Sequence, residues 1–284
     1  MKNVYKHGLS LLSEIQNTSL HEDTLALWYL GQEGFVIKGR ANVLYVDPYL
    51  SNSIHEDQLG MSGAAVRDYA PPILPVDVKN ADFVLCTHFH QDHMDQQTLA
   101  PIAVSSPHAL FVIPASHINL AMSFGIPENR IVPAKHMEQF QLGEFLVTPI
   151  AEKHQIFETD ENGNHFYLGF VLQANGVTIY HSGDTIYFPE LVQQLQPYAI
   201  DIALINSNGR DWIRDEMDLV GNMNYKEALE FGCRIQADLV VPMHYDMFAA
   251  NRENPAYFVD YLFSRHREQK FHMFAVGERF IYHK

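Results

Sequence analysis

The segment THFHQDHMD, residues 87–95, places three histidines and two aspartates within eight positions. His88 and His90 are two residues apart, so on an extended chain their side chains point the same way. Asp92 and His93 follow at once, where the chain must turn. Imidazole nitrogen and carboxylate oxygen are ligands that Zn²⁺, Mn²⁺ and Fe²⁺ accept. The segment therefore predicts one part of a metal site, whose other ligands must come from elsewhere in the chain.

Further histidines and aspartates stand at the ends of other apolar runs that have the composition of strands. His154 ends FLVTPIAEKH, Asp184 ends VTIYHSGD and His244 ends DLVVPMH. Asp47 ends NVLYVD in the same way. One polar residue at a strand end is usually only a turn former. Five strands that each finish in a histidine or an aspartate instead indicate a shared metal site.

The number and type of these residues predict a site for two ions. Ions about 3.5–4 Å apart need a shared anionic ligand and separate ligands for each ion. The predicted ligands are His88, His90 and His154 for the first ion, Asp92, His93 and His244 for the second, and Asp184 as the bridge. The expected cofactors are two divalent ions, Zn²⁺ or Mn²⁺, with Fe²⁺ as a further candidate. Such ions lower the pKa of a bound water and so make hydroxide available as the nucleophile. Asp92 and Asp184 are the predicted catalytic carboxylates.

The elements that must position these residues follow an order typical of an α/β fold. Runs rich in β-branched and aromatic residues predict strands at 25–30, 34–39, 42–50, 82–88, 109–115, 145–154, 167–184, 201–207, 238–244 and 271–283. The pair Asn175-Gly176 predicts a hairpin turn inside the longest run. Helical patterns lie at 3–17, after Asp95, and at 116–124, 188–196, 224–236 and 255–268. This order predicts two mixed β-sheets packed face to face with helices outside.

We interpret residues 1–284 as one domain. It would carry a helical extension at 1–23 and a long, proline-closed insertion at 51–77. Loops of that length are usually functional, so we expect the insertion to lie near the active site.

Composition argues against several classes of partner. The 284 residues include 34 acidic and 19 basic side chains, for a formal net charge of −15. Phosphate backbones normally require a basic stripe, so we expect no nucleic acid and favour a small-molecule substrate. The first twenty residues lack the apolar core of a signal peptide, and no run is long enough to span a bilayer. Cys86 and Cys233 are isolated, so we expect a cytoplasmic protein. We also expect no membrane partner and assembly as a homo-oligomer.

THFHQDHMD, HSGDT and VPMHYD together resemble the metallo-β-lactamase superfamily. LGQEGFVIKG followed by VLYVDPYL resembles that superfamily's opening strands. YHSGDTIYFPE, DIALINSNGR and MNYKEALEFGCRIQADLVVPMHYDMF are most similar to its UlaG-type branch, the L-ascorbate-6-phosphate lactonases and their relatives. The resemblance covers nearly all of the chain from residue 25. It implies an αββα sandwich and a metal-dependent hydrolase.

Three further residues are candidates for supporting roles. Asp47 is expected behind a ligand, where it would accept a hydrogen bond from an imidazole N–H, although a turn acid ahead of Pro48 explains it equally well. Asn208 and Arg210 follow a strand end on the same rim and are candidates for binding a polar substrate or a phosphate. Ordinary polarity of an exposed loop is the alternative for both.

The predicted function is hydrolysis of a small sugar-acid lactone, with or without a phosphate group. A phosphodiesterase acting on a small phosphodiester would share every ligand and remains an alternative. A second alternative is a non-catalytic scaffold that uses its metals only for folding. Structural metal sites are closed by protein ligands, whereas seven ligands across two ions leave room for water, which favours an enzyme.

Overall fold

The computed structural model describes residues 4–54, 66–217 and 219–284. The strands of the first sheet are β1 (Thr24–Gly31), β2 (Gly34–Lys38), β3 (Val43–Val46), β4 (Phe83–Leu85), β5 (Leu110–Pro114), β6 (Ile131–Ala134) and β14 (Arg279–His283). Those of the second are β7 (Phe140–Leu142), β8 (Phe145–Ala151), β9 (Leu168–Ala174), β10 (Val177–His181), β11 (Ile202–Asn206), β12 (Leu239–Met243) and β13 (Lys270–Phe271). The helices are α1 (Gly8–Asn17), α3 (Gln96–Ser105), α4 (Ile118–Ser123), α5 (Pro189–Leu195), α6 (Trp212–Glu216), α7 (Tyr225–Arg234) and α8 (Pro255–Arg265).

Both sheets are mixed and have the same arrangement of strand directions. The first has the order β14-β1-β2-β3-β4-β5-β6, antiparallel as far as β3 and parallel beyond it. The second has the order β7-β8-β9-β10-β11-β12-β13, antiparallel as far as β10 and parallel beyond it. The predicted hairpin is confirmed, because β9 and β10 pair through Ala174 and Val177 while Asn175 and Gly176 both have positive φ.

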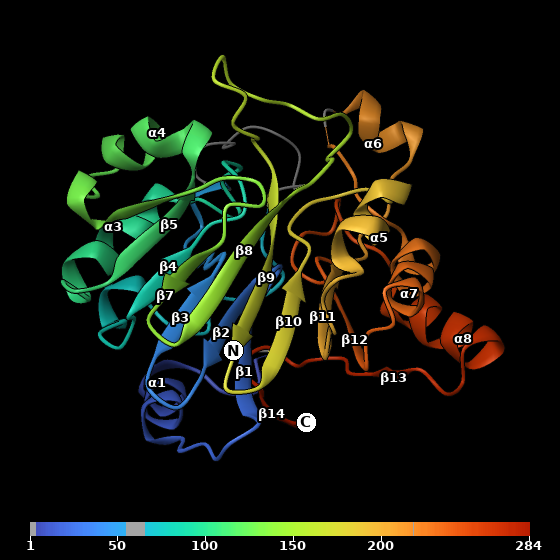
Figure 1. The fold of residues 1–284 in the computed structure, drawn as a ribbon, viewed down its shortest axis with the longest axis horizontal. Helices are drawn as coiled ribbons and strands as arrows, with labels where there is room; N and C mark the ends of the chain where they lie inside the picture. Colours follow the sequence, from blue (N-terminus) through green and yellow to red (C-terminus); the bar gives the residue numbers. More distant parts are fainter. Residues whose placement is uncertain (1–3, 55–65, 218) are drawn as a thin grey trace.

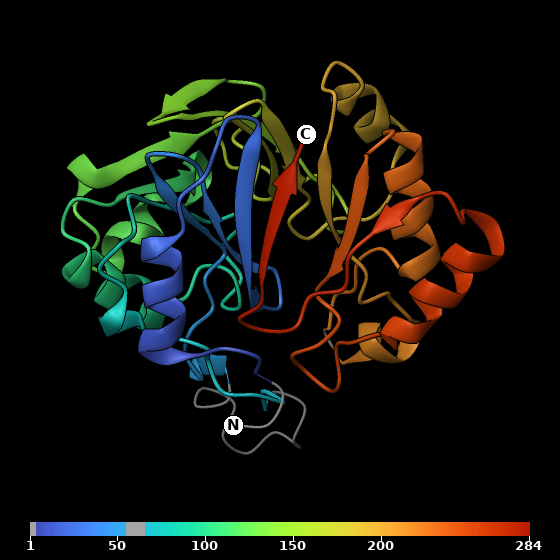
Figure 2. The ribbon, with the colours of Figure 1, turned by 90° about the horizontal axis from the view of Figure 1, so that it is seen from below.

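Apolar side chains fill three layers. Along β1, Leu27 faces a core between the two sheets that also contains Leu172 of β9, while Trp28 faces helices α1 and α3. This alternation follows from the two-residue period of a strand. On the outer face of the second sheet, Tyr180 of β10 packs with Leu229 of α7 in a third cluster. Figures 1 and 2 show helices outside both sheets, which confirms the expected αββα sandwich.

Strand direction determines where the chemistry lies. In the first sheet β1, β3 and β4 run the same way, and in the second β8, β10, β11 and β12 do. The segments that follow these strands therefore lie at the carboxyl edges of the sheets, where open α/β proteins form their sites.

Some elements differ from the sequence-based expectation. Neither β6 nor β7 was expected, and β6 contains Pro133, which its place at the end of the sheet order tolerates. Helix α6 was also not expected; it begins after Asp211, whose carboxylate accepts from the backbone N–H of Ile213 and Arg214. The helical pattern at 3–17 forms α1. Residues 1–3 of the N-terminal extension and 55–65 of the 51–77 insertion lie outside the described residues.

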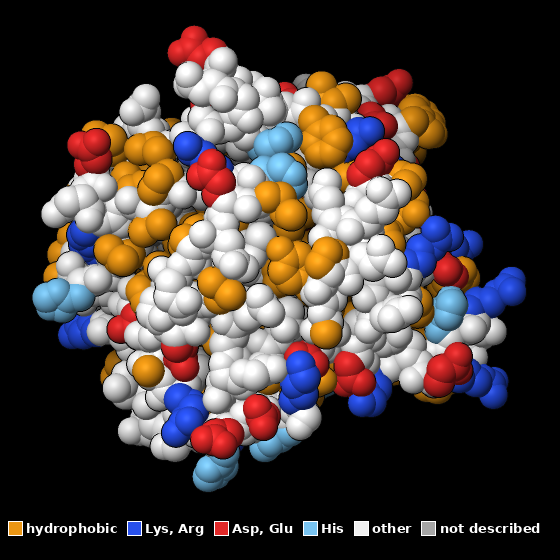
Figure 3. Space-filling model, in the orientation of Figure 1, with side chains coloured by type: hydrophobic (Ala, Val, Ile, Leu, Met, Phe, Trp, Pro, Cys, Tyr) orange, Lys and Arg blue, Asp and Glu red, His pale blue; other side chains and the backbone are white. Residues whose placement is uncertain are grey.

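Across the part of the chain that the structure describes, no helix combines the length and apolar character needed to cross a membrane. Lys and Arg side chains are interspersed with acidic ones on the face shown in Figure 3. Cytoplasmic location, assembly as a homo-oligomer and the exclusion of nucleic acid stay predictions.

Candidate metal centre

The structure brings all seven predicted ligands together at the carboxyl edges of the two sheets. They follow β4, β8, β10 and β12, so both sheets contribute. Three groups of residues each place their candidate ligand atoms within 4.8 Å of one another: His88, His93 and Asp184; His90, His154 and Asp184; and Asp92, His93 and His244. Asp184 belongs to two of these groups, which share the centre of the site.

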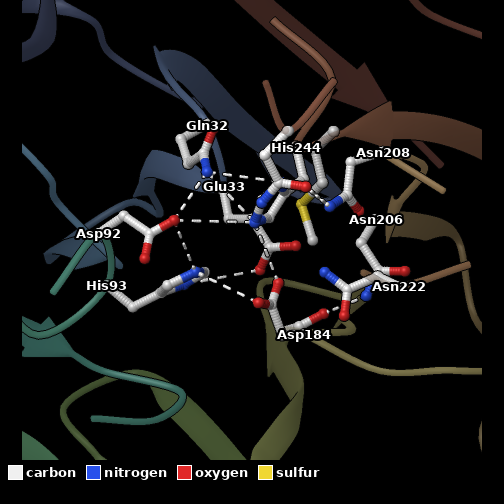
Figure 4. A network of polar contacts seen from close by, with 12 residues as sticks. Gln32, Glu33, Asp92, His93, Asp184, Asn206, Asn208, Asn222 and His244 are labelled. Atoms are coloured by element: carbon white, nitrogen blue, oxygen red, sulfur yellow. Dashed lines mark hydrogen bonds and ion pairs between the residues drawn. The ribbon is translucent and has the colours of Figure 1, made fainter. Parts of the chain in front are cut away.

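The two carboxylate oxygens of Asp184 face different ligands. Oδ1 lies 3.3 Å from His244 Nε2, whereas Oδ2 lies 3.7 Å from His88 Nε2 and 3.8 Å from the Nε2 atoms of His93 and His154. His244 Nε2 is in turn 3.8 Å from Asp92 Oδ2, and Figure 4 shows the carboxylate of Asp184 pointing toward His93 and His244. A carboxylate placed in this way is suited to bridge two cations.

Asp47 orients the imidazole of His93 directly and that of His88 through Thr87. It is fully buried, and its Oδ2 accepts a 2.8 Å hydrogen bond from His93 Nδ1. The Thr87 hydroxyl donates to the same oxygen at 2.6 Å, so its own oxygen is left to accept from His88 Nδ1 at 3.0 Å. With hydrogen on Nδ1, the Nε2 lone pairs of His88 and His93 face the centre. Both Nε2 atoms are buried without a hydrogen-bond partner in the described part of the chain, which is the condition that a bound cation would satisfy.

Asn222 orients His154 in the same manner. Its Oδ1 lies 2.9 Å from His154 Nδ1, which turns the Nε2 of that ring toward Asp184. The backbone oxygen of Asn222 accepts from the Arg210 guanidinium at 2.8 Å. Arg210 also makes a bidentate ion pair with Glu227, at 2.6 and 2.7 Å. Arg210 thus supports the backbone of Asn222, and a role for Arg210 in binding substrate stays a prediction.

The second candidate for substrate binding, Asn208, is fully buried beside the centre. Its Nδ2 donates to Asn251 Oδ1 at 2.9 Å, and its Oδ1 has no hydrogen-bond partner among the described residues. A role in binding substrate therefore stays a prediction for Asn208.

The comparisons with known proteins agree with this geometry. A family model described as the beta-lactamase superfamily domain matches residues 42–245. The chain belongs to the beta-lactamase superfamily, and with this ligand set it is a metallo-hydrolase of that superfamily.

One curated relative is the "Probable L-ascorbate-6-phosphate lactonase UlaG" of Escherichia coli O45:K1, which is 26% identical over 278 residues, covering 87% of this chain and 77% of the relative. The likeness confirms the UlaG-type branch. Two solved structures show the same fold. Igni18, a metallo hydrolase from Ignicoccus hospitalis KIN4/I, matches with a TM-score of 0.67 at 22% identity, covering 92% of this chain and 99% of Igni18. An isothiocyanate hydrolase from Delia radicum gut bacteria matches with a TM-score of 0.72 at 18% identity, covering 91% of this chain and all of that one (100%).

In this member of the superfamily, the turn between β1 and β2 also reaches the centre, which the sequence reasoning missed. The Gln32 side-chain amide donates to Asp92 Oδ2 at 2.8 Å and lies 3.2 Å from His244 Nε2. The Gln32 carbonyl accepts from the backbone N–H of His244 at 2.7 Å, which ties the turn to the end of β12. Glu33 follows at the floor of the site. The direction of β1 could have identified this turn, because β1 runs parallel to β3 and therefore places GQEG at the same edge of the sheet as the end of β3.

Tyr167 is a further residue that the sequence reasoning missed. Its hydroxyl lies 3.4 Å from His90 Nε2, and its ring packs against those of His88 and His154. It precedes β9, whose carboxyl end lies at the opposite edge, so no strand-end signal identified it.

The electrostatics of the centre favour a cation. Burial raises the pKa of Asp184, but His244 and His93 outweigh burial and hold that pKa below its usual value. Burial lowers the pKa of His93, but Asp92 and Asp184 outweigh it and raise that pKa well above its usual value. For His154 burial dominates and lowers the pKa to about 4, which keeps that ring neutral. A divalent metal would therefore displace the proton of His93 and bind its Nε2 beside the ionised carboxylate of Asp184 and the neutral ring of His154.

Proposed function

We propose that the protein is a lactonase that uses two divalent metal ions to open a lactone of a small sugar acid. The observation that carries the two-ion proposal is the central placement of Asp184, whose Oδ1 faces His244 and whose Oδ2 faces His88, His93 and His154. Zn²⁺, Mn²⁺ and Fe²⁺ all accept this donor set.

The choice of a lactone is supported by likeness alone. A relative that covers most of this chain at 26% identity is named as a probable L-ascorbate-6-phosphate lactonase. A lactone is also a neutral or locally anionic small molecule, which suits a chain with a formal net charge of −15 better than a polyanion would.

Each residue of the site would have its own role in this reaction. When bound, the ions polarise the carbonyl of the substrate and activate water. His88, His90 and His154 would hold one ion, and Asp92, His93 and His244 the other. Asp184 would fix the separation between the ions. Asp47 and Asn222 keep hydrogen on the Nδ1 atoms of His93 and His154, so that Nε2 stays available.

The test is a substrate panel with protein reconstituted separately with Zn²⁺ and with Mn²⁺. It compares sugar-acid lactones, with and without a phosphate group, against bis-p-nitrophenyl phosphate as a phosphodiester and simple esters as a reference. We expect the largest kcat/KM for a lactone, and loss of that activity in Asp184→Asn. A larger kcat/KM for the phosphodiester would replace the lactonase by the phosphodiesterase. No turnover by the metal-loaded protein, together with unfolding on chelation, would favour the scaffold.

A further inference from the structure

Glu33 is a buried carboxyl group that the seven-ligand set leaves without a role. It lies in the turn between β1 and β2 and has no exposed surface. Neither of its carboxyl oxygens has a hydrogen-bond partner in the part of the chain that the structure describes. Burial of a carboxyl without hydrogen bonds is costly, and native proteins rarely leave one in this state. A partner beyond the described residues would offset that cost.

The surroundings of Glu33 identify the kind of partner. Candidate ligand atoms of Glu33, Asp184 and His244 lie within 4.8 Å of one another, and Figure 4 shows the carboxyl of Glu33 among the labelled ligands. The nearest imidazole nitrogen, His93 Nδ1, is 3.8 Å from Oε2 and already donates to Asp47. The missing partner is therefore a cation.

A separate cation site behind the centre is the competing arrangement, and the hydrogen bonds argue against it. Glu33, Asp47 and His181 also place candidate ligand atoms within 4.8 Å of one another. However, His181 Nε2 lies 2.9 Å from the backbone oxygen of Glu33, and its Nδ1 accepts from the N–H of Gly183 at 3.2 Å. Both ring nitrogens of His181 are therefore used, whereas on the other side of Glu33 the Oδ1 atom of Asp184 has no hydrogen-bond partner among the described residues.

We propose that Glu33 is an additional ligand of the second metal ion, the one assigned to Asp92, His93 and His244, and that it makes this position prefer Mn²⁺ over Zn²⁺. The first position offers three imidazoles and the shared carboxylate of Asp184. The second would offer two imidazoles and three carboxylates. Carboxylate-rich positions suit Mn²⁺, whereas imidazole suits Zn²⁺. The inference rests on the two-ion site of the proposed function but not on the lactone as substrate.

The experiment is calorimetric titration of metal-free protein with MnCl₂ and, separately, with ZnCl₂, with bound metal counted by elemental analysis after dialysis. Wild type is expected to bind two equivalents of Mn²⁺. Glu33→Gln keeps the shape of the side chain but removes its charge, so the second equivalent of Mn²⁺ should bind at least about 10-fold more weakly. The first equivalent should be unchanged, and the loss for Zn²⁺ at the second position should be smaller.

Glu152→Gln is the matched control. Glu152 is a second buried carboxyl, whose Oε1 accepts from the Tyr180 hydroxyl at 2.6 Å and whose Oε2 has no hydrogen-bond partner among the described residues. It is in none of the groups of candidate ligands found in the described chain. Glu152→Gln should therefore leave both equivalents of Mn²⁺ at wild-type affinity, which separates ligation from the general effect of removing a buried acid.

Wild-type affinity for both equivalents in Glu33→Gln would overturn the proposal, and equal losses for Mn²⁺ and Zn²⁺ would overturn its selectivity. If Glu33→Gln does not fold, a crystal structure of wild type loaded with Zn²⁺ decides the matter. A Glu33 oxygen about 2.0–2.2 Å from the second ion supports ligation, and a longer separation refutes it. Failure of the lactone panel would leave these binding results intact, so the two proposals fail separately.

Discussion

Replacement of Asp47 by asparagine tests how the orientation of the ligand His93 affects metal binding while His93 itself stays in place. The Asp47 carboxylate accepts three hydrogen bonds: 2.8 Å from the Thr87 N–H, 2.6 Å from the Thr87 hydroxyl and 2.8 Å from His93 Nδ1. Asparagine has nearly the same shape and tolerates the positive φ of this position, which is 41°. Its oxygen would keep the bond to the Thr87 N–H. Its NH₂ group would then face His93 Nδ1.

An NH₂ group at that place reverses the tautomer of His93. Nδ1 must then accept a hydrogen bond, so the ring proton moves to Nε2, the atom that faces Asp92 at 3.6 Å and Asp184 at 3.8 Å. A protonated Nε2 does not bind a metal. Loss of a partner of this kind typically weakens metal binding by about 10–100-fold, which is about 1.4–2.7 kcal/mol. The loss should fall on the second ion, to which His93 is assigned together with Asp92 and His244.

The assay is titration of metal-free Asp47→Asn with MnCl₂, with Asp95→Asn as the control. Asp95 is equally buried, but its carboxylate accepts from Gln97 N and the Thr98 hydroxyl at the start of α3 instead of from an imidazole. Asparagine caps a helix about as well as aspartate does, so this replacement should change the free energy of unfolding by less than about 1 kcal/mol and leave metal binding unchanged. Wild-type affinity for the second ion in Asp47→Asn would refute the tautomer argument.

Three further predictions follow from the same geometry. Asp184→Asn should lose metal content and turnover together, as measured by elemental analysis and initial rates; full activity with metal lost would contradict the bridge. Asn222→Ala should weaken binding of the first ion about 10-fold through His154 and spare the second, as measured by calorimetry. Metal-free protein should melt at lower temperature as pH rises above about 6.5, because the folded-state pKa of His93 is raised, so its stabilising proton is lost as pH passes that pKa. A melting temperature that rises over this range would contradict the last prediction.

The sequence predicted the seven-ligand set because the signal for each ligand is local. A histidine or aspartate directly after an apolar run is visible without a structure, as for His244 after LVVPM. Strands that run in the same direction end at the same edge, so separate strand ends imply one site. For Asp47 the sequence left two interpretations open, a partner of an imidazole and a turn acid ahead of Pro48, and the hydrogen bond from His93 Nδ1 supports the first.

The residues that the sequence missed depend on pairings between distant segments. Asn222 meets His154 from 68 positions away and follows no strand. Arg210 was itself a candidate from the sequence, but its ion pair was not foreseen, because the partner Glu227 lies on α7, 17 positions later. Gln32 and Glu33 stand between two apolar runs, where GQEG has the composition of an ordinary hairpin turn. Only the direction of β1 relative to β3 shows that this turn lies at the metal edge.

The two halves of the centre differ in how their charges are balanced, and this difference is independent of the substrate. Asn222 orients His154 with a neutral amide, whereas Asp47 orients His93 with a charge, and Glu33 adds a second carboxyl beside it without a partner of its own. More negative charge therefore surrounds the second position than the first. Because like charges buried together cannot all ionise without a cation, the second position should bind its ion with the larger release of protons. Calorimetry of Mn²⁺ binding in two buffers of different ionisation enthalpy measures that release for each equivalent. Equal proton release at both steps would show that the unpartnered carboxyl is not coupled to the metal.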